Sequence, residues 1–381
     1  MNNISEYSDC ANCGACYNIC PTSAITVDTD EIFYSVNVDP EKCINCGICK
    51  TVCPVNNTEK RQHIISSYGG CSNDLKIVKT SSSGGAFYEI SKKIIADGGI
   101  VFSAVYTDDF KEVYFCGTDE KSLQSMMKSK YVESRVGLSF RAVKAELESG
   151  REVMFCGAPC QVAGLKRYLR RDYSNLLTCD FSCGGMPSHK IYSQYLDGIE
   201  KKLRSPISGV DFRPKIYGWD MHTIKIDSIS GRKYVKMFMQ DPYFYSFIGN
   251  HISVRDYCYK CEFADNHYSD IIIADFWKCK TESRITNNNT GLSLIITCSQ
   301  KGEEYIQKIR KSFSLTVLDN QKATYNLKKK IVPSDSFYEK RTSFLSECTD
   351  RGFNRAVKNI KLKSGIKAKM RYYIKKFLLN R

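Results

Sequence analysis

The strongest constraint on this chain is a cysteine spacing that occurs twice near its N-terminus. Residues 10–21 read CANCGACYNICP and residues 43–54 read CINCGICKTVCP, so both follow the pattern C-x2-C-x2-C-x3-C-P. Iron–sulfur clusters are held by closely spaced thiolates of this kind, whereas a zinc site needs four ligands and no third cysteine at this step. The spacing therefore favours iron–sulfur clusters over zinc in residues 1–57.

The cysteine count and the start of the chain indicate a reducing compartment. The chain has 19 cysteines among 381 residues, which is an odd number, and it does not begin with a basic stretch followed by an apolar one. Cytosolic thiols stay reduced, so we interpret the clustered cysteines as metal ligands rather than disulfides. No apolar run approaches the ~18 residues of a membrane-spanning helix. We therefore expect a cytoplasmic protein of roughly two or three domains.

The net charge of +15 is unevenly distributed along the chain. Residues 1–57 carry −5, residues 58–350 carry +9, and residues 351–381 carry +11 with no acidic residue. An acidic head, a mildly basic body and a strongly basic tail argue against a general nucleic-acid coat. In the tail, apolar residues recur at steps of three and four, which predicts a basic amphipathic helix. Such a helix fits an anionic membrane surface at the inner face of the membrane, an acidic partner, or docking on its own body.

Strands and helices alternate after a polar linker at residues 56–61. We expect short strands near 24–27 and 33–38 in the head, and in the body strands at 64–70, 100–106, 152–155, 176–181, 269–274 and 292–297, with helices at 87–95, 139–147, 160–171 and 303–311. This pattern predicts an α+β or α/β protein. Its expected parts are a ferredoxin-like two-cluster domain at 1–57, a mixed α/β body in two pieces at 64–170 and 171–330, and the basic helix at 351–381.

A serine- and glycine-rich turn precedes the first helix of the body. Residues 80–87 read TSSSGGAF. Backbone N–H groups at a helix start can hold a phosphate, and glycine lets a ligand approach closely. The same residues also fit a serine N-cap with a tight turn, which is the simpler interpretation of this segment alone.

Six motifs in the body occur in the order found in one protein family. They are SKYV at 129–132, GAPCQVAGL at 157–165, CGG at 183–185, FRPK at 212–215 with Gly218 and Trp219, CYKC at 258–261 and SDIIIADFW at 269–277. Because these motifs occur in this order, the chain resembles the beta subunit of coenzyme F420 hydrogenase and dehydrogenase. The resemblance runs from about Ser66 to Lys311. Its first 57 residues resemble the bacterial two-[4Fe–4S] ferredoxin domain, which bacterial members of the family carry in front.

The resemblance implies three sets of cluster ligands. In two-cluster ferredoxins the fourth cysteine of each run ligates the other cluster. Carried over, one head cluster is held by Cys10, Cys13, Cys16 and Cys53, and the other by Cys43, Cys46, Cys49 and Cys20. The family's recurrent body cysteines fall on Cys160, Cys183, Cys258 and Cys261, which would hold a third [4Fe–4S] cluster. Zinc and free buried thiols are the alternatives for this third set.

The resemblance also implies a flavin site and an activity. Family members bind FAD and pass electrons between a cluster and a hydride-accepting molecule, which is coenzyme F420 in the archaeal members. The flavin-binding residues carried over are Ser81, Ser82, Ser83, Gly84, Gly85, Lys130 and Tyr131. We expect an iron–sulfur flavoprotein oxidoreductase that takes electrons from a ferredoxin or another redox protein and reduces a small acidic, deazaflavin-like or otherwise conjugated acceptor. The alternative is an electron-transfer subunit of a larger hydrogenase/dehydrogenase-type or biosynthetic complex, with no substrate of its own.

Several single residues carry smaller expectations. Arg213, Lys215 and Lys260 suit an acidic acceptor, and Trp219 or Trp277 could stack on a flat ring. The family often has Asp where Pro214 stands and Gly where Lys278 stands. His189 follows a predicted helix start, and we expect it on the surface. We assign no catalytic residue.

Overall fold

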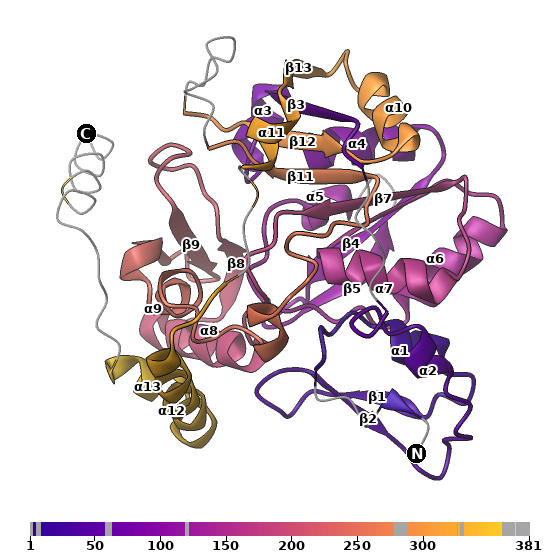
Figure 1. The fold of residues 1–381 in the computed structure, drawn as a ribbon. Helices are drawn as coiled ribbons and strands as arrows, with labels where there is room; N and C mark the ends of the chain where they lie inside the picture. The colour runs from indigo at the N-terminus through magenta and orange to yellow at the C-terminus, as the bar shows by residue number, and fades with distance from the viewer. Residues whose placement is uncertain are drawn as a thin grey trace.

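A small cysteine-rich head lies against one end of a larger mixed α/β body in the computed structural model of the chain (Figure 1). The structure describes residues 3–4, 9–57, 63–118, 122–277, 289–325, 327, 331–359 and 370.

The head consists of two short helices and one hairpin. Its elements are α1 (Ala15–Ile19), β1 (Ile25–Asp28), β2 (Ser35–Val38) and α2 (Ile48–Thr51). Each helix starts at a glycine in the left-handed region, Gly14 with φ 87° and Gly47 with φ 73°, a conformation that glycine adopts without strain. The two strands pair antiparallel, close to the segments that the sequence predicts.

The body is built on one eight-stranded sheet. Its strands are β3 (Ser66–Ser72), β4 (Ile100–Tyr106), β5 (Val113–Thr118), β6 (Val153–Gly157), β7 (Leu176–Phe181), β11 (Ile271–Asp275), β12 (Ser293–Thr297) and β13 (Phe313–Leu318). They lie in the order β13-β3-β12-β11-β7-β6-β4-β5, with β4, β6, β7 and β11 parallel and antiparallel strands on both sides. The continuous apolar runs of the central strands are explained by burial on both faces.

Helices cover both faces of this sheet (Figure 1). They are α3 (Leu75–Thr80), α4 (Ala86–Ala96), α5 (Leu123–Met126), α6 (Ser139–Glu148), α7 (Pro159–Leu169), α10 (Gln300–Lys308) and α11 (Asn320–Thr324). In β6, Val153 and Phe155 pack with α6 and α7, whereas Met154 and Cys156 pack with α4 and α10. The head packs on the α6–α7 face, so its core is continuous with that of the body.

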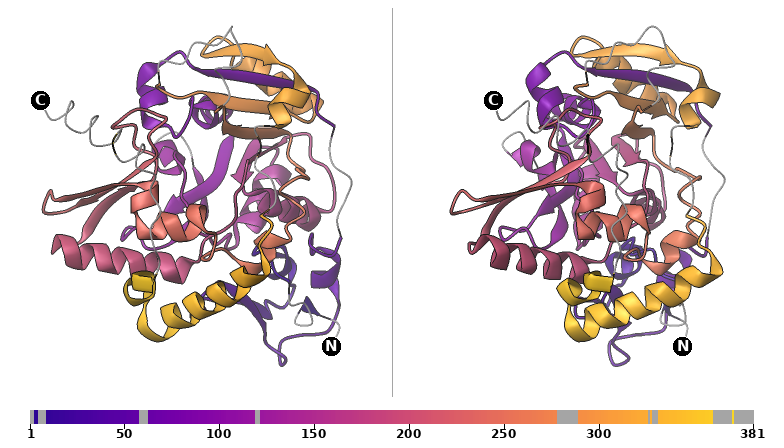
Figure 2. Two further views of the ribbon diagram at one scale, coloured as in Figure 1. Left: turned by 60° about the vertical axis from the view of Figure 1, so that its left-hand side comes forward. Right: turned by 90° about the vertical axis from the view of Figure 1, so that its left-hand side faces the viewer.

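A second, smaller sheet lies beside the first. The elements of this part are α8 (His189–Leu203), β8 (Ile207–Asp211), β9 (Thr223–Ser228), β10 (Lys233–Met237), α9 (Pro242–Phe244), α12 (Asp335–Arg351), α13 (Phe353–Ala356) and the short turns η3 (Phe238–Gln240), η4 (Tyr245–Gly249), η5 (Asp256–Tyr259) and η7 (Val357–Asn359). Its strands are antiparallel in the order β10-β9-β8. Figure 2 shows this sheet beside α8, with α12 and α13 next to that helix. Buried aromatic rings hold these elements together, among them Tyr195, Tyr243 and Phe353.

The mixed α/β architecture agrees with the sequence-based prediction, but the predicted division of the body near residue 170 falls inside the large sheet. β6 precedes that position, β7 follows it, and the two are paired in parallel with α7 as their crossover helix. Parallel neighbours require such a crossover, so residue 170, directly after α7, lies on a connection within one sheet.

The predicted basic tail lies largely outside the described residues. Of residues 351–381, the structure describes 351–359, which contain the end of α12, α13 and η7, and residue 370. Among the helices of the described residues, none combines the length and the apolar character that a membrane crossing requires.

Candidate functional site

Four head thiols, Cys10, Cys13, Cys16 and Cys53, form what we call the inner head set. Burial, followed by the influence of neighbouring thiols, raises the pKa values of Cys13 and Cys16. The neighbours that oppose their ionisation include Cys10 and Cys53, so Cys53 lies with the first cysteine run rather than its own. Buried thiols that repel one another when ionised fit a bound metal group, which takes cysteine as thiolate.

The other four head cysteines line a single cavity and form the outer head set. The lining includes Cys20, Cys43, Cys46 and Cys49. Cys20 therefore lies with the second run, and the backbone N–H of Ala24 donates to its sulfur at 3.3 Å. Backbone N–H groups aimed at ligand sulfurs are a recurrent feature of iron–sulfur sites. The crossed ligand assignment is supported by this placement.

Ligand crossing has a direct spectroscopic consequence. Cys20→Ser should damage the cluster of the outer head set, because Cys20 lines the same cavity as Cys43, Cys46 and Cys49. Its EPR spectrum should match that of Cys46→Ser and differ from that of Cys13→Ser, with a loss of up to about four irons. A Cys20→Ser spectrum that instead matches Cys13→Ser would contradict the crossed assignment.

Four body cysteines surround a third site, which we call the body set. Cys160 lies in the first turn of α7, and Cys183 follows β7. Cys258 lies in η5 and Cys261 after it, and all four cysteines line one small cavity. Burial and the other three thiols raise the pKa of Cys160 well above its usual value. Among the described residues no three His, Cys, Asp or Glu side chains are grouped closely enough to hold one metal ion. Four thiols spaced around a cavity fit a larger group such as a [4Fe–4S] cluster.

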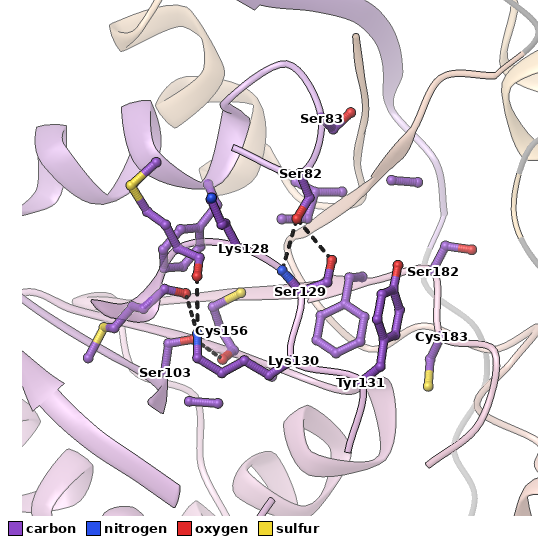
Figure 3. A pocket seen from close by; sticks show the side chains of 18 of the residues that line it. Ser82, Ser83, Ser103, Lys128, Ser129, Lys130, Tyr131, Cys156, Ser182 and Cys183 are labelled. Atoms are coloured by element: carbon purple, nitrogen blue, oxygen red, sulfur yellow. Dashed lines mark hydrogen bonds between the residues drawn. The ribbon is translucent and has the colours of Figure 1, made fainter. Parts of the chain in front are cut away.

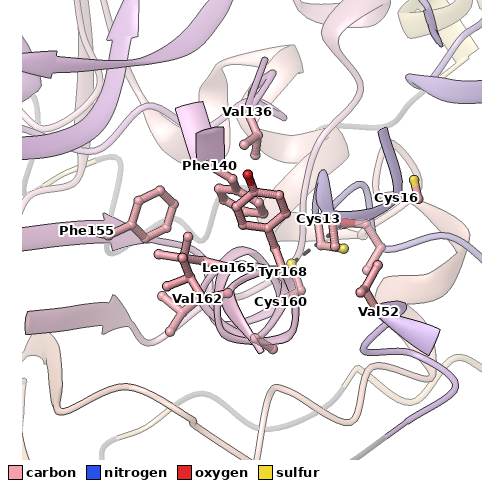
Figure 4. Packing of buried hydrophobic residues seen from close by; sticks show 14 of the residues in the cluster. Cys13, Cys16, Val52, Val136, Phe140, Phe155, Cys160, Val162, Leu165 and Tyr168 are labelled. Atoms are coloured by element: carbon pink, nitrogen blue, oxygen red, sulfur yellow. Dashed lines mark hydrogen bonds between the residues drawn. The ribbon is translucent and has the colours of Figure 1, made fainter. Parts of the chain in front are cut away.

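The body set lies directly against the inner head set (Figure 4). The Cys160 thiol is 3.7 Å from the backbone oxygen of Ala11. One turn along α7, a Cβ on Gly164 would stand 3.1 Å from the Cys13 sulfur, so the missing side chain lets the head approach the helix closely. The inner head set and the body set are thus neighbours across the contact between the head and α7.

A cavity of about 310 Å³, here called the central cavity, opens at the carboxyl ends of β6, β7 and β11. The terminal residues Gly157, Phe181 and Asp275 of these three strands all line it. This edge is where open α/β sheets bind ligands, and the volume is within the ~300–1,000 Å³ range of ligand pockets. Six of the seven flavin residues carried over from the family also line it: Ser81, Ser82, Ser83, Gly85, Lys130 and Tyr131.

The seventh residue, Gly84, lies behind the cavity wall and has a packing role. A Cβ there would stand 2.4 Å from the Gly70 oxygen and 2.6 Å from the Ser293 nitrogen. The N-cap of α4 is Gly85, with φ 93° and no side-chain cap, so the simpler interpretation of the serines as an N-cap is wrong. The Ser82 hydroxyl instead accepts from the backbone N–H of Ser129 at 2.9 Å, which ties the turn to the segment carrying Lys130 (Figure 3).

Two lysines with low pKa values lie at this turn. Lys130 Nζ donates to the backbone oxygens of Met126 at 3.3 Å and Met127 at 3.1 Å, and burial lowers its pKa to about 7 (Figure 3). Lys215 Nζ donates to the Ser83 oxygen at 2.6 Å, and burial together with Arg213 lowers its pKa to about 7. A buried ammonium that is easily neutralised favours an anionic group beside it.

Trp277 forms the outer part of the cavity wall, and Trp219 and Arg213 lie behind it. Trp277 lines the cavity, is 38% exposed, and stacks on Trp219 with ring centroids 4.1 Å apart. The Arg213 guanidinium lies 5.1 Å from the Trp277 ring centre and pairs with Asp275 at 2.8 Å. Lys260, by contrast, pairs with Asp9 of the head, away from the cavity.

Some residues differ from the sequence-based expectation or were missed. His189 is 5% exposed rather than on the surface, because the head covers the start of α8 and Tyr34 stacks on its ring at 3.6 Å. Lys278 lies outside the described residues. Ser129 and Cys156 line the central cavity and were not predicted; Ser129 follows from its place in the SKYV motif, whereas Cys156 had no signal beyond its strand.

Two family models match this chain. Residues 150–322 match the C terminus of the coenzyme F420 hydrogenase/dehydrogenase beta subunit, and residues 9–57 match a 4Fe-4S dicluster domain. The resemblance seen in the motifs is therefore confirmed: residues 9–57 are similar to a 4Fe-4S dicluster domain, and residues 150–322 are similar to the C terminus of this beta subunit. No curated protein matches the chain.

Among solved structures, the chain resembles one from the xenon-derivatised F420-reducing [NiFe] hydrogenase complex of Methanosarcina barkeri. The two are 14% identical with a TM-score of 0.47, and the match covers 78% of this chain and 91% of the other. This likeness is too low to support any argument about the site.

Proposed function

We propose that this chain, which joins a 4Fe–4S dicluster domain to a body of the coenzyme F420 hydrogenase/dehydrogenase beta-subunit type, is an iron–sulfur flavoprotein oxidoreductase. A ferredoxin or another redox protein would supply electrons at the head, and a small acidic acceptor would receive them at the central cavity. The observation that carries this proposal is that Cys183 lines both the body-set cavity and the central cavity. The three thiol sets and the central cavity are thereby arranged in sequence from head to body.

The lining of the central cavity fits FAD, which when bound would collect single electrons and pass them on as a pair. The turn at residues 81–85 and Lys130 would hold an anionic part, through backbone N–H groups and an ammonium. Tyr131 packs among Phe212, Phe244 and Phe247, which makes the adjoining wall apolar and rigid. Such a wall would exclude water from the reacting ring.

The acceptor is proposed to bind at the Trp277 side of the cavity. A half-exposed indole stacked on a second indole offers a platform for a flat conjugated ring. Arg213 lies over the same ring and would attract a carboxylate or phosphate on the acceptor. This arrangement supports an acidic conjugated acceptor without naming it.

One observation favours the second candidate, an electron-transfer subunit with no substrate of its own. Phe181 and Trp277 both line the central cavity and are each 38% exposed. Exposed aromatic side chains at one site are also typical of a surface that docks another protein. In that case a partner subunit would cover the cavity and receive the electrons.

The experiment that separates the two is acceptor reduction by the isolated protein. We expect FAD to copurify anaerobically or to be reconstituted, and dithionite-reduced protein to reduce a small acidic acceptor by two electrons as the flavin reoxidises. Flavin absorbance and acceptor absorbance would be followed together under argon. If only protein partners reoxidise the flavin, the electron-transfer subunit is favoured; if no flavin can be bound, the proposal is wrong.

A further inference from the structure

A buried polar cluster joins the head to the body, and none of the steps above uses it. Glu133 is fully buried, and its Oε2 accepts from Arg255 Nη2 at 2.6 Å and Arg255 Nε at 3.2 Å. Its Oε1 is 2.7 Å from His189 Nδ1 and accepts from the backbone N–H of Tyr34 at 3.1 Å. Tyr34 belongs to the head, so one body carboxylate anchors both the head hairpin and the arginine.

Arg255 extends this cluster to two of the thiol sets. Its Nη2 donates to the Tyr34 oxygen at 2.5 Å, and its Nη1 donates to the Cys10 oxygen at 3.4 Å. Its own backbone oxygen accepts from the N–H of Cys258 at 3.0 Å. A single residue thus contacts one member of the inner head set and one member of the body set.

The charge of Arg255 also lies at this joint. The guanidinium is buried, and it interacts electrostatically with the thiols of both Cys10 and Cys258. Burial alone would raise the pKa of Glu133, yet Arg255 and His189 hold it below its usual value, so the pair is ionised. A planar fork held by several acceptors fixes both the position and the direction of this charge, which a lysine would not do.

We propose that Arg255 is a positioning residue for electron transfer between the inner head set and the body set. Its hydrogen bonds fix the head on the body, and its charge, offset by Glu133, sets how an electron is shared between the two neighbouring clusters. This inference rests on the proposed function, because it presumes a cluster at each set.

The test compares two variants of opposite charge change in the full-length, anaerobically purified protein. Arg255→Gln removes a cation and should lower the reduction potentials of the adjacent clusters, whereas Glu133→Gln removes an anion and should raise them. We expect each variant to change the distribution of an electron between an adjacent cluster and the unaffected outer head cluster about tenfold. The change is opposite in the two variants, and for one electron it corresponds to a shift of about 59 mV in the reduction potential. EPR-monitored redox titration measures both shifts.

Two further variants separate charge from packing. Arg141→Gln removes another cationic contact between body and head, in which Arg141 donates to the oxygens of Asn18 at 2.8 Å and Cys20 at 3.1 Å, and it should leave the body cluster's potential unchanged. Arg255→Lys keeps the charge but not the fork, so it should retain the potentials while amide hydrogen exchange at Tyr34 accelerates. If Arg255→Gln loses its clusters, the reduction potentials of Arg255→Lys and Glu133→Gln test the role of Arg255 instead.

The outcomes separate this inference from the proposed function. Shifts of the same sign in Arg255→Gln and Glu133→Gln, or no shift with the irons retained, would overturn the role of Arg255. Wild-type protein with about eight irons would instead remove the body cluster and contradict the proposed electron path. In that case electron transfer between the two sets falls with the proposed path. Opposite shifts on the inner head cluster would still show that Arg255 and Glu133 set its potential, and their absence there would overturn that role as well.

Discussion

Replacing Cys258 and Cys261 with serine should lower the iron content of the purified protein from about twelve to about eight atoms per chain. Both thiols line the same cavity as Cys160 and Cys183, and two remaining thiols cannot hold a cubane cluster. Iron and acid-labile sulfide analysis under anaerobic conditions measures this loss. The head clusters should survive, because their eight ligands lie outside the body set.

The same variant should also stop electrons from reaching the central cavity. The body set is the group of thiols that lies between the inner head set and that cavity, with Cys160 on one side and Cys183 on the other. Head clusters reduced by a redox partner should therefore leave bound flavin oxidised, whereas dithionite, which acts directly, should still reduce it. Stopped-flow absorbance distinguishes the two routes.

Cys71→Ser with Cys116→Ser is the matched control for this variant. These two cysteines are also partly buried in the body, but they lie in β3 and β5 and line none of the three cysteine sites. Their loss should leave about twelve irons. If the Cys258 and Cys261 variant keeps the same iron content as this control, the body set holds no cluster.

The head could be anticipated almost completely because its determinants are local. Four cysteines at fixed steps fix the ligands, and Gly14 and Gly47 allow the left-handed turns that start the two helices. The exchange of Cys20 and Cys53 between the runs came from the family resemblance, since no spacing alone specifies it.

Local sequence patterns predicted only part of the body. Short apolar runs predicted β4 and β7, and apolar residues at helical spacing predicted α6, all nearly to the residue. The small sheet β8-β9-β10 was not predicted, because its strands mix polar and apolar residues. Their burial is explained only by the aromatic rings that pack on the sheet.

The joint between head and body could not be predicted from sequence at all. Glu133, His189 and Arg255 are more than 50 residues apart along the chain, and each alone is indistinguishable from a solvated polar residue. Burial of His189 follows from contact with Tyr34, a residue of another domain. Such sites become visible only when the domains are seen in contact.

The affinity for FAD should fall as the pH rises above 7. Lys130 has a pKa of about 7 because it is buried, so in the ligand-free protein it is increasingly neutral above that pH. An anion favours the protonated form, and binding above pH 7 must therefore take up a proton. We expect the dissociation constant to be flat below pH 7 and to increase about tenfold per pH unit above it, until the pKa of the bound state is reached.

Two variants decide whether Lys130 is the source of this dependence. Lys130→Arg keeps a cation that does not titrate, and Lys215, the other lysine with a pKa of about 7, does not line the cavity, so FAD affinity should become independent of pH between about 7 and 9. Lys130→Met removes the cation, so its affinity should be weak at pH 6 and equally weak at pH 9. Fluorescence titration of FAD into flavin-depleted protein measures all three dissociation constants. A wild-type affinity that stays constant from pH 6 to 9 would show that Lys130 does not face an anionic part of the ligand, and the orientation proposed for FAD in the central cavity would then be wrong.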